Sequence, residues 1–250
     1  MVNKRVLLVT GGGRGIGAAT ARLAATREYE VCLTYLRNRS AAEGVAAAIN
    51  DAGGAARVMQ ADVSIESDVV HLFRAVDEEC GRITALVNNA GMLETQMRVD
   101  EMDAGRLTRV FAANVVGAML CCREAVRRMS TRYGGTGGVI VNLSSAAARL
   151  GSPGEYVDYA AAKAAIDTLT IGLAREVGAE GVRVNAVRPG LIHTEIHASG
   201  GEPERVARLA ASIPMKRGGT ADEVASSILW LLSDEATYVN GAILDVTGGR

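Results

Sequence analysis

A tyrosine and a lysine stand four residues apart in the segment Tyr159-Ala-Ala-Ala-Lys163. Positions i and i+4 share one face of a helix, so the phenol and the ammonium would point into the same site. A cation beside a phenol stabilises the phenolate, so we expect Lys163 to lower the pKa of Tyr159 from its ordinary value of about 10. Such a tyrosine can donate and accept a proton near neutral pH, which is general acid–base chemistry.

A glycine-rich turn, Thr10-Gly-Gly-Gly-Arg-Gly-Ile-Gly17, lies near the start of the chain. It follows an apolar run and precedes a helical pattern of small residues. The backbone N–H groups of such a turn, together with the helix N-terminus behind it, can bind a diphosphate. A dinucleotide beside a proton donor indicates redox chemistry between a carbonyl and an alcohol.

Short apolar runs alternate with longer helical patterns along the chain. Strands are predicted at residues 5–10, 30–35, 56–61, 83–88, 138–143, 182–187 and 242–246. Helices are predicted at 16–26, 41–51, 67–80, 105–132, 156–177 and 220–232. This alternation predicts an α/β fold in which helices cover both faces of a parallel sheet. No linker divides the chain, so we predict one domain over residues 1–250.

Ligands of such sheets bind beyond the carboxyl ends of the strands. The candidate motifs follow predicted strands: residues 11–17 after the first, Asn89 after the fourth, Ser145 after the fifth and residues 189–194 after the sixth. The sequence therefore predicts one site at this edge of the sheet.

Taken together, these motifs resemble the short-chain dehydrogenase/reductase family over nearly the whole chain. The resemblance rests on the glycine turn at 10–17, Asp62-Val63, Asn88-Asn-Ala-Gly91, Asn114, Ser144-Ser145, Tyr159-Ala-Ala-Ala-Lys163 and Pro189-Gly190. Each match is modest alone, but their order and spacing are specific together. The resemblance implies a single-domain Rossmann fold with a seven-stranded parallel sheet and a nicotinamide cofactor.

The resemblance also implies a catalytic set of Asn114, Ser145, Tyr159 and Lys163. Tyr159 would exchange a proton with the substrate oxygen, which Ser145 would hold and polarise. Lys163 would keep the phenol acidic and hydrogen-bond the nicotinamide ribose. Asparagine is a poor helix former, and Asn114 would perturb its helix and order a water for proton relay to the lysine.

The serine position departs from the family pattern. The family usually places twelve residues between the serine and the tyrosine, whereas thirteen separate Ser145 from Tyr159. The register of the strand at 139–145 favours Ser145, and the loop at 151–158 can absorb the extra residue. Ser144 is the alternative.

The residues expected to bind the cofactor lie in the glycine turn, at the ends of later strands and in the catalytic helix. They are Thr10, Gly11, Arg14, Gly15, Ile16, Gly17, Arg37, Asp62, Val63, Asn89, Ala90, Gly91, Tyr159, Lys163, Pro189, Gly190, Ile192 and Thr194. NAD enzymes place an acid at the end of the second strand to bind the ribose hydroxyl. This chain has Arg37 and Arg39 there, with Arg14 in the glycine turn, and arginine suits a phosphate. NADP is favoured over NAD; the alternative is that both strand-end arginines are only solvated.

The segment at about 191–218 is expected to form a lid over cofactor and substrate, with a mobile tip at 199–203. His193 and Tyr156 are candidates for substrate contact. The lid has few large apolar residues, which favours a sugar, a polyol or a small ketone. The alternatives are a 3-oxoacyl-thioester reductase, a non-catalytic NADP-binding sensor and a Rossmann-fold methyltransferase; the last would leave Tyr159 and Lys163 without a role.

Composition and charge limit the remaining possibilities. The net charge of −1 gives no basic excess for nucleic acid, and no apolar stretch approaches the length of a membrane span. The start shows no signal-peptide pattern, so we expect a cytoplasmic protein. His193 and His197 are a weak metal signal, and no metal is expected. The four cysteines have no ligand spacing and are predicted to be buried. The family resemblance implies a homotetramer, or a dimer.

Overall fold

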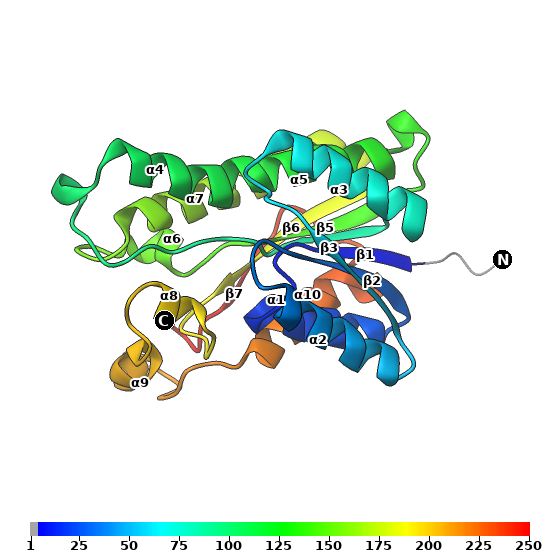
Figure 1. Cartoon of the computed structure of the whole chain (residues 1–250). Coiled ribbons are helices and arrows are strands. Elements are labelled where there is room, and N and C mark those ends of the chain that lie inside the picture. Colours follow the sequence, from blue (N-terminus) through cyan, green and yellow to red (C-terminus); the bar gives the residue numbers. More distant parts are fainter. Residues whose placement is uncertain (1–4) are drawn as a thin grey trace.

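The computed structural model describes residues 5–250. Residues 1–4 lie outside the described residues, and they are part of the segment in which the sequence analysis looked for a signal peptide. The strands are β1 (Arg5–Val9), β2 (Tyr29–Tyr35), β3 (Ala55–Gln60), β4 (Ala85–Asn88), β5 (Gly138–Leu143), β6 (Val182–Pro189) and β7 (Ile243–Val246). They form one sheet in the order β3-β2-β1-β4-β5-β6-β7, with every neighbouring pair parallel (Figure 1). The predicted seven-stranded parallel sheet is confirmed.

Helices cover both faces of this sheet (Figure 1). One layer contains α1 (Gly15–Ala25), α2 (Arg39–Asp51) and α10 (Ala221–Leu232). The other contains α3 (Glu66–Glu79), α4 (Ala104–Phe111), α5 (Gly117–Met129) and α7 (Val157–Val177). Three short helices, α6 (Ala147–Leu150), α8 (Ile196–Ser199) and α9 (Arg205–Leu209), were not predicted. Within residues 5–250, no helix has the length and apolar character needed to cross a membrane.

The central strand β1 shows why the chain forms two layers. Successive side chains of a strand point to opposite faces. Leu7 and Val9 pack in the cluster with α1, α2 and α10, while Val6 and Leu8 pack in the cluster with α3 and α5. Because both faces of β1 are buried, its sequence is a continuous apolar run rather than an alternating one.

The chain reverses direction across the sheet between β1 and β4. From β1 it moves outward through β2 to β3, then returns to place β4 on the other side of β1. The loops that leave β1 and β4 therefore diverge to opposite faces, and a crevice opens at their carboxyl ends. This is the edge at which the sequence predicts the site.

The helix predicted at 105–132 is interrupted. After α4 the chain makes a π-helical stretch, Ala112–Val116, before α5 begins. Asn114 lies in this stretch, and its Nδ2 donates to the Val110 carbonyl at 2.9 Å. A widened turn of this kind is frequent at functional sites. The prediction that Asn114 perturbs its helix is confirmed.

Candidate active site

The loops that follow β1 and β4 are tied together by hydrogen bonds. The Thr10 hydroxyl accepts from the backbone N–H groups of Asn89 and Ala90, both at 3.0 Å. The Asn89 side chain returns two bonds, donating to the carbonyls of Thr10 and Gly11 at 2.9 Å each. Two motifs almost eighty residues apart therefore form one floor beneath the crevice.

Close approach explains the glycines of the turn. A Cβ atom at Gly17 would overlap the Gly11 carbonyl oxygen and would lie 2.5 Å from Asn89 Nδ2. Gly11 itself has φ of 66°, a left-handed conformation that favours glycine. The glycines thus allow the start of α1 to pack directly against the turn at Gly11 and against Asn89. No side chain at these glycines stands between the backbone of the turn and a ligand.

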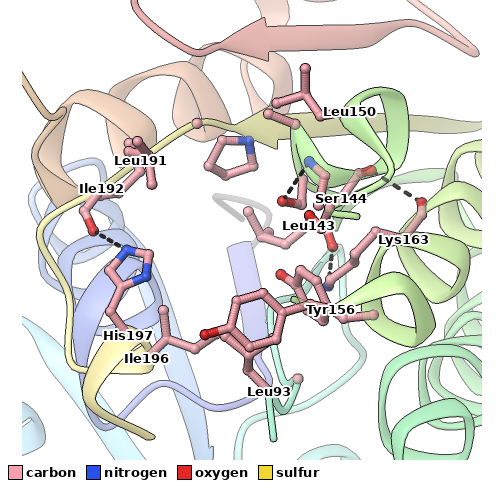
Figure 2. Close-up of a pocket in the computed structure, with 18 of the residues that line it drawn as sticks. Leu93, Leu143, Ser144, Leu150, Tyr156, Lys163, Leu191, Ile192, Ile196 and His197 are labelled. Carbon is pink, nitrogen blue, oxygen red and sulfur yellow. Dashed lines mark hydrogen bonds between the residues drawn. The ribbon is translucent and has the colours of Figure 1, made fainter. Parts of the chain in front are cut away.

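A cavity of about 460 Å³ lies above this floor (Figure 2). Its polar wall includes the side chains of Ser145, Tyr159 and Lys163. The rest of the wall combines aliphatic and polar side chains. The aliphatic ones include Leu93, Leu143, Leu150, Leu191, Ile192 and Ile196, and the polar and charged ones include Ser152, Glu155, Tyr156, His197, Arg205 and Arg250. The cavity therefore brings three residues of the predicted catalytic set together with a chamber that has an aliphatic and a polar part.

Lys163 is buried between the end of β5 and the Tyr159 ring. Its Nζ donates to the Leu143 carbonyl at 2.7 Å and lies 5.6 Å from the centre of the Tyr159 ring. Burial lowers the pKa of Lys163 to about 8, although the nearby Asp167 carboxylate opposes this shift. The amine is thus held next to the tyrosine but bonded to the end of β5.

Burial raises the pKa of Tyr159 to about 12, and hydrogen bonding to Ser145 acts in the opposite direction. The expectation that Lys163 lowers this pKa is not met in this structure. Desolvation dominates because the phenol sits in the cavity wall while the ammonium is engaged by Leu143. The phenol is therefore protonated at neutral pH, the form that can donate to a substrate oxygen.

The two adjacent serines have different surroundings. Ser144 is buried, and its hydroxyl donates to the backbone carbonyl of Lys163 at 3.2 Å. The Ser145 hydroxyl accepts from the Ala147 N–H at 3.1 Å, and its proximity to the phenol acts to lower the pKa of Tyr159. Ser144 thus fastens β5 to α7, whereas Ser145 acts on the phenol.

Asn114 reaches the same region from the π-helical stretch. Its amide clamps the backbone of Met92, accepting from the N–H at 3.2 Å and donating to the carbonyl at 3.0 Å. A Cβ atom at Gly91 would lie 2.7 Å from Asn114 Oδ1 and 3.6 Å from Lys163 Nζ. The asparagine and the lysine therefore both lie beside Gly91.

Two arginines near the glycine turn and the end of β2 have side chains without a polar partner among residues 5–250. The side chains of Arg14 and Arg37 are exposed and make no hydrogen bond or ion pair with any residue of 5–250. Arg39 differs, because its Nε pairs with Glu43 at 2.7 Å. Two free guanidinium groups therefore remain near the glycine turn and the end of β2.

The other predicted cofactor residues divide between the wall and its surroundings. The cavity wall includes Ile16, Asn89, Gly91, Tyr159, Lys163, Pro189, Gly190, Ile192 and Thr194. The residues outside this wall are Thr10, Gly11, Arg14, Gly15, Gly17, Arg37, Asp62, Val63 and Ala90. Thr194 packs against Gly15, so the segment after β6 reaches the glycine turn. The Asp62 carboxylate accepts two bonds from Ser64, at 2.9 Å and 2.6 Å.

The segment at 191–218 contains α8 and α9 and is fastened by polar contacts. The Tyr156 hydroxyl donates to the Gly200 carbonyl at 3.1 Å. Arg205 is buried and pairs with Glu155 and, at 2.8 Å, with Glu202. These contacts place the segment against the loop that precedes α7.

In the sequence His197 belongs only to a weak metal signal, whereas His193 is also a candidate for substrate contact. His193 is exposed and lies outside the cavity wall, while His197 is part of it. His197 Nε2 lies 3.0 Å from the Ile192 carbonyl, so this nitrogen donates. Burial lowers the pKa of His197, and its Nδ1 is buried without a partner among residues 5–250. No motif marks this histidine, because its position depends on how α8 folds back. Tyr156, the other candidate, does line the cavity.

Known proteins resemble this chain in both sequence and fold. A family model described as enoyl-(acyl carrier protein) reductase matches residues 11–250. The uncharacterized oxidoreductase YgfF of Escherichia coli is 58% identical over 98% of this chain and 99% of its own. The 3beta-hydroxysteroid dehydrogenase 1 of Eggerthella lenta is 38% identical over 98% of this chain and 93% of its own. A short-chain dehydrogenase from Burkholderia cenocepacia, solved in complex with NADP, superposes with a TM-score of 0.89 at 31% identity, covering 98% of this chain and 97% of that one.

Proposed function

The chain belongs to the short-chain dehydrogenase/reductase family and is an oxidoreductase, and we propose that it interconverts a carbonyl and a secondary alcohol with NADP(H). The observation that carries the proposal is that Ser145, Tyr159 and Lys163 share one cavity. That cavity lies over the glycine turn and the Asn89 floor. Membership in a family of oxidoreductases argues against a non-catalytic sensor and against a methyltransferase.

The residues present suit a dinucleotide. The glycine turn has no room for a Cβ atom at Gly17, and the free guanidinium groups of Arg14 and Arg37 suit a 2′-phosphate. When bound, NADPH supplies the hydride. Residues 10–17, Arg37 and Asp62 would hold its adenosine and diphosphate part. Ile192 and Thr194 would hold its nicotinamide end.

Residues of the chain itself would carry out the proton transfer. In reduction the Tyr159 hydroxyl donates its proton to the substrate oxygen, and in oxidation the phenolate takes it back. Ser145 hydrogen-bonds the same oxygen and stabilises the charge that develops on it. Lys163, with its positive charge, stabilises the tyrosinate left after transfer. The role implied for Asn114, ordering a water toward Lys163, stays a prediction.

The cavity wall bears on the substrate. The lid contributes Ile192 and Ile196, but Leu93, Leu143 and Leu150 come from other parts of the chain. The chamber therefore has a larger aliphatic part than the lid sequence suggested, beside a polar part that includes Glu155 and Arg205. We infer that a small ketone with an apolar body is a better candidate than a sugar or polyol. A relative named for a hydroxysteroid fits this inference. A 3-oxoacyl thioester stays the alternative, since the description of the matching family model, enoyl-(acyl carrier protein) reductase, names an acyl-carrier substrate.

The remaining proposals concern organisation. We propose one domain over residues 1–250, a substrate lid at 191–218, a cytoplasmic location and a homotetramer. Exposed apolar side chains on α4, α5 and α7, at Leu107, Phe111, Met119 and Ile171, suit contacts between subunits.

The proposed reaction is tested by the loss of NADPH absorbance on mixing with carbonyl compounds. The panel contains cyclic and aryl ketones, small diketones, ketoses, aldoses and 3-oxoacyl thioesters, with NADH in parallel. We expect turnover of apolar ketones with NADPH and weaker turnover with NADH. If NADPH binds in a titration but no carbonyl on the panel is reduced, the proposal fails for these substrate classes.

Arg37→Asp is expected to shift cofactor preference toward NADH. The change removes a free cation from the end of β2 and places a carboxylate there, which repels a phosphate and can accept from a ribose hydroxyl. The kcat/KM ratio of NADPH to NADH should fall by roughly tenfold or more, since one charge-assisted contact contributes about 1.5–3 kcal/mol. The matched control is Arg39→Asp, because Arg39 is already paired with Glu43. An unchanged ratio in Arg37→Asp would contradict the assignment.

A further inference from the structure

Arg106 and Asp158 form a buried ion pair outside every motif that the sequence analysis used. Their side chains are only 3% and 1% exposed, and two contacts join them, Nε to Oδ2 at 2.7 Å and Nη2 to Oδ1 at 3.4 Å. Two buried charges lose their hydration, and their attraction repays this cost only with good geometry and further hydrogen bonds. Such a pair is weak evidence for stability. The residues that it holds in place are therefore a better guide to its role.

On one side the pair holds the backbone of the proposed proton donor. Asp158 lies in the first turn of α7 and directly precedes Tyr159. Its Oδ1 accepts from the Tyr159 N–H at 2.9 Å. A carboxylate in this position satisfies one of the free donors at a helix start and fixes the first turn. The phenol therefore projects from a turn whose backbone is held by a buried anion.

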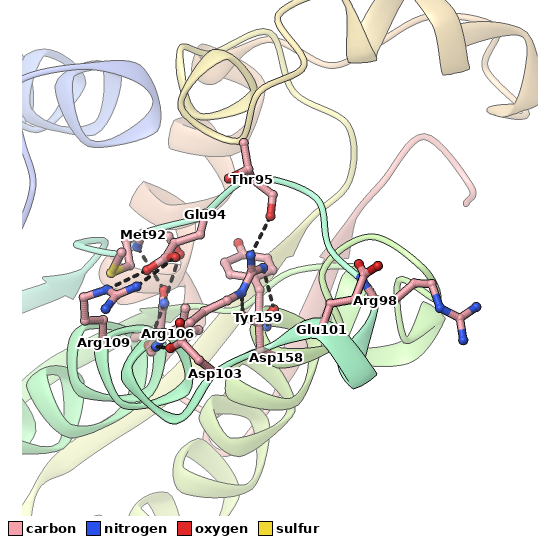
Figure 3. A network of polar contacts seen from close by, with 12 residues as sticks. Met92, Glu94, Thr95, Arg98, Glu101, Asp103, Arg106, Arg109, Asp158 and Tyr159 are labelled. Atoms are coloured by element: carbon pink, nitrogen blue, oxygen red, sulfur yellow. Dashed lines mark hydrogen bonds and ion pairs between the residues drawn. The ribbon is translucent and has the colours of Figure 1, made fainter.

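On the other side the pair holds the loop between β4 and α4 (Figure 3). Arg106 Nη1 donates to the Thr95 carbonyl at 2.7 Å. Two residues earlier in this loop, Leu93 forms part of the cavity wall. Arg106 is also fixed by its own helix, because Asp103 accepts from its backbone N–H at 2.7 Å. One guanidinium thus joins α4, the start of α7 and the loop that carries a wall of the chamber.

We propose that Arg106 and Asp158 are a positioning pair for the carbonyl–alcohol reaction. The pair sets the distance between the Tyr159 phenol and the wall at Leu93, and so the pose in which a carbonyl meets the proton donor. Neither side chain reaches the glycine turn or the end of β2, so the pair acts on the chemical step and on substrate fit but not on cofactor affinity. This inference rests on the proposed function.

The decisive variant is the double substitution Arg106→Met with Asp158→Leu. Replacing a buried ion pair by apolar residues of similar volume is often neutral or stabilising. We therefore expect a melting temperature near that of the wild type. We also expect kcat/KM for a ketone to fall by about 10- to 100-fold, because a misplacement of about 1 Å can cost 10²-fold. The Kd for NADPH should not change.

The matched control is Arg109→Met. Arg109 lies one turn further along α4, and its Nε pairs with Glu94 of the same loop at 2.9 Å. Arg109 is exposed and Glu94 half-buried, and within residues 5–250 no side-chain hydrogen bond or ion pair joins either of them to α7. Its loss should leave kcat, KM and hydrogen exchange at the Tyr159 amide unchanged. Wild-type kcat/KM in the double variant would overturn the proposal, as would an equal loss in Arg109→Met.

A single substitution serves if the double variant does not fold. In Asp158→Asn the amide oxygen can still accept from the Tyr159 N–H, so kcat should lie between those of the wild type and Asp158→Ala. Equal kcat in all three would overturn the proposal. Hydrogen exchange at the Tyr159 amide gives a readout without substrate: it should be faster in Asp158→Ala than in Arg109→Met. If the wild type reduces no carbonyl, the proposed function has failed, and equal exchange in these two variants would separately overturn the positioning role.

Discussion

Tyr159→Phe is expected to lower kcat by about 10²- to 10⁴-fold, the range contributed by a positioned general acid. The change removes one hydroxyl and keeps the ring that packs beside Lys163, with Nζ 5.6 Å from its centre. The fold and the cofactor site should persist because the floor made by Thr10 and Asn89 does not involve this side chain. The substrate oxygen would lose its proton donor and one of its two hydrogen-bond partners.

The measurement is single-turnover oxidation of NADPH with the best ketone from the panel. Titration with NADPH and a melting curve serve as internal controls, and both should match the wild type. The matched control is Tyr133→Phe, which removes the hydroxyl of an exposed tyrosine outside the cavity wall. This variant should leave the rate unchanged. Full activity of Tyr159→Phe would refute the assigned mechanism.

Gly17→Ala is expected to weaken NADPH binding by roughly tenfold or more and to destabilise the fold. The new methyl group would overlap the Gly11 carbonyl and press on Asn89 Nδ2, so the turn and the floor must move apart. Overpacking of this kind costs about 1–3 kcal/mol, and about 1.4 kcal/mol corresponds to a factor of ten in affinity. Isothermal titration with NADPH and thermal unfolding measure the two effects.

The control for this substitution is Gly44→Ala, also within a helix. A Cβ atom at Gly44 has no other atom within 4 Å, apart from its own chain neighbours and the backbone of its helix. That change should leave NADPH affinity unaltered and stabilise the protein by about 0.4–1 kcal/mol, since alanine restricts the unfolded chain. If Gly17→Ala behaved like Gly44→Ala, close approach would not be the reason for glycine in the turn.

Local patterns were sufficient for the sheet and for much of the site. Each strand was an apolar run between helical patterns, and parallel connectivity brings every carboxyl end to one edge. Asn89, Ser145 and Pro189 lie there because each is within two residues of the carboxyl end of a strand. The perturbed helix at Asn114 was also predictable, since the family resemblance singled out an asparagine within a helical pattern.

Other features depend on contacts that no local pattern contains. Arg106 and Asp158 are 52 residues apart, and each alone is typical of an exposed helix position. Leu93 belongs to the loop after β4 and Leu150 to the short helix α6, so the aliphatic part of the wall exists only after folding. The raised pKa of Tyr159 has the same origin: the spacing to Lys163 was predictable, but the extent of burial was not.

The reciprocal bonds between Thr10 and Asn89 have a kinetic consequence. These bonds join groups of the chain itself and need no ligand, so we expect little conformational entropy to be lost there when a dinucleotide binds. The opposite wall is different, because the segment with α8 and α9 is fastened chiefly through side chains, such as Tyr156 and Arg205, that can exchange partners. We therefore expect the two halves of the cavity to differ in mobility. Residence time of the dinucleotide would then be governed by the side that opens, and variants of Tyr156 or Arg205 should change the dissociation rate more than the association rate.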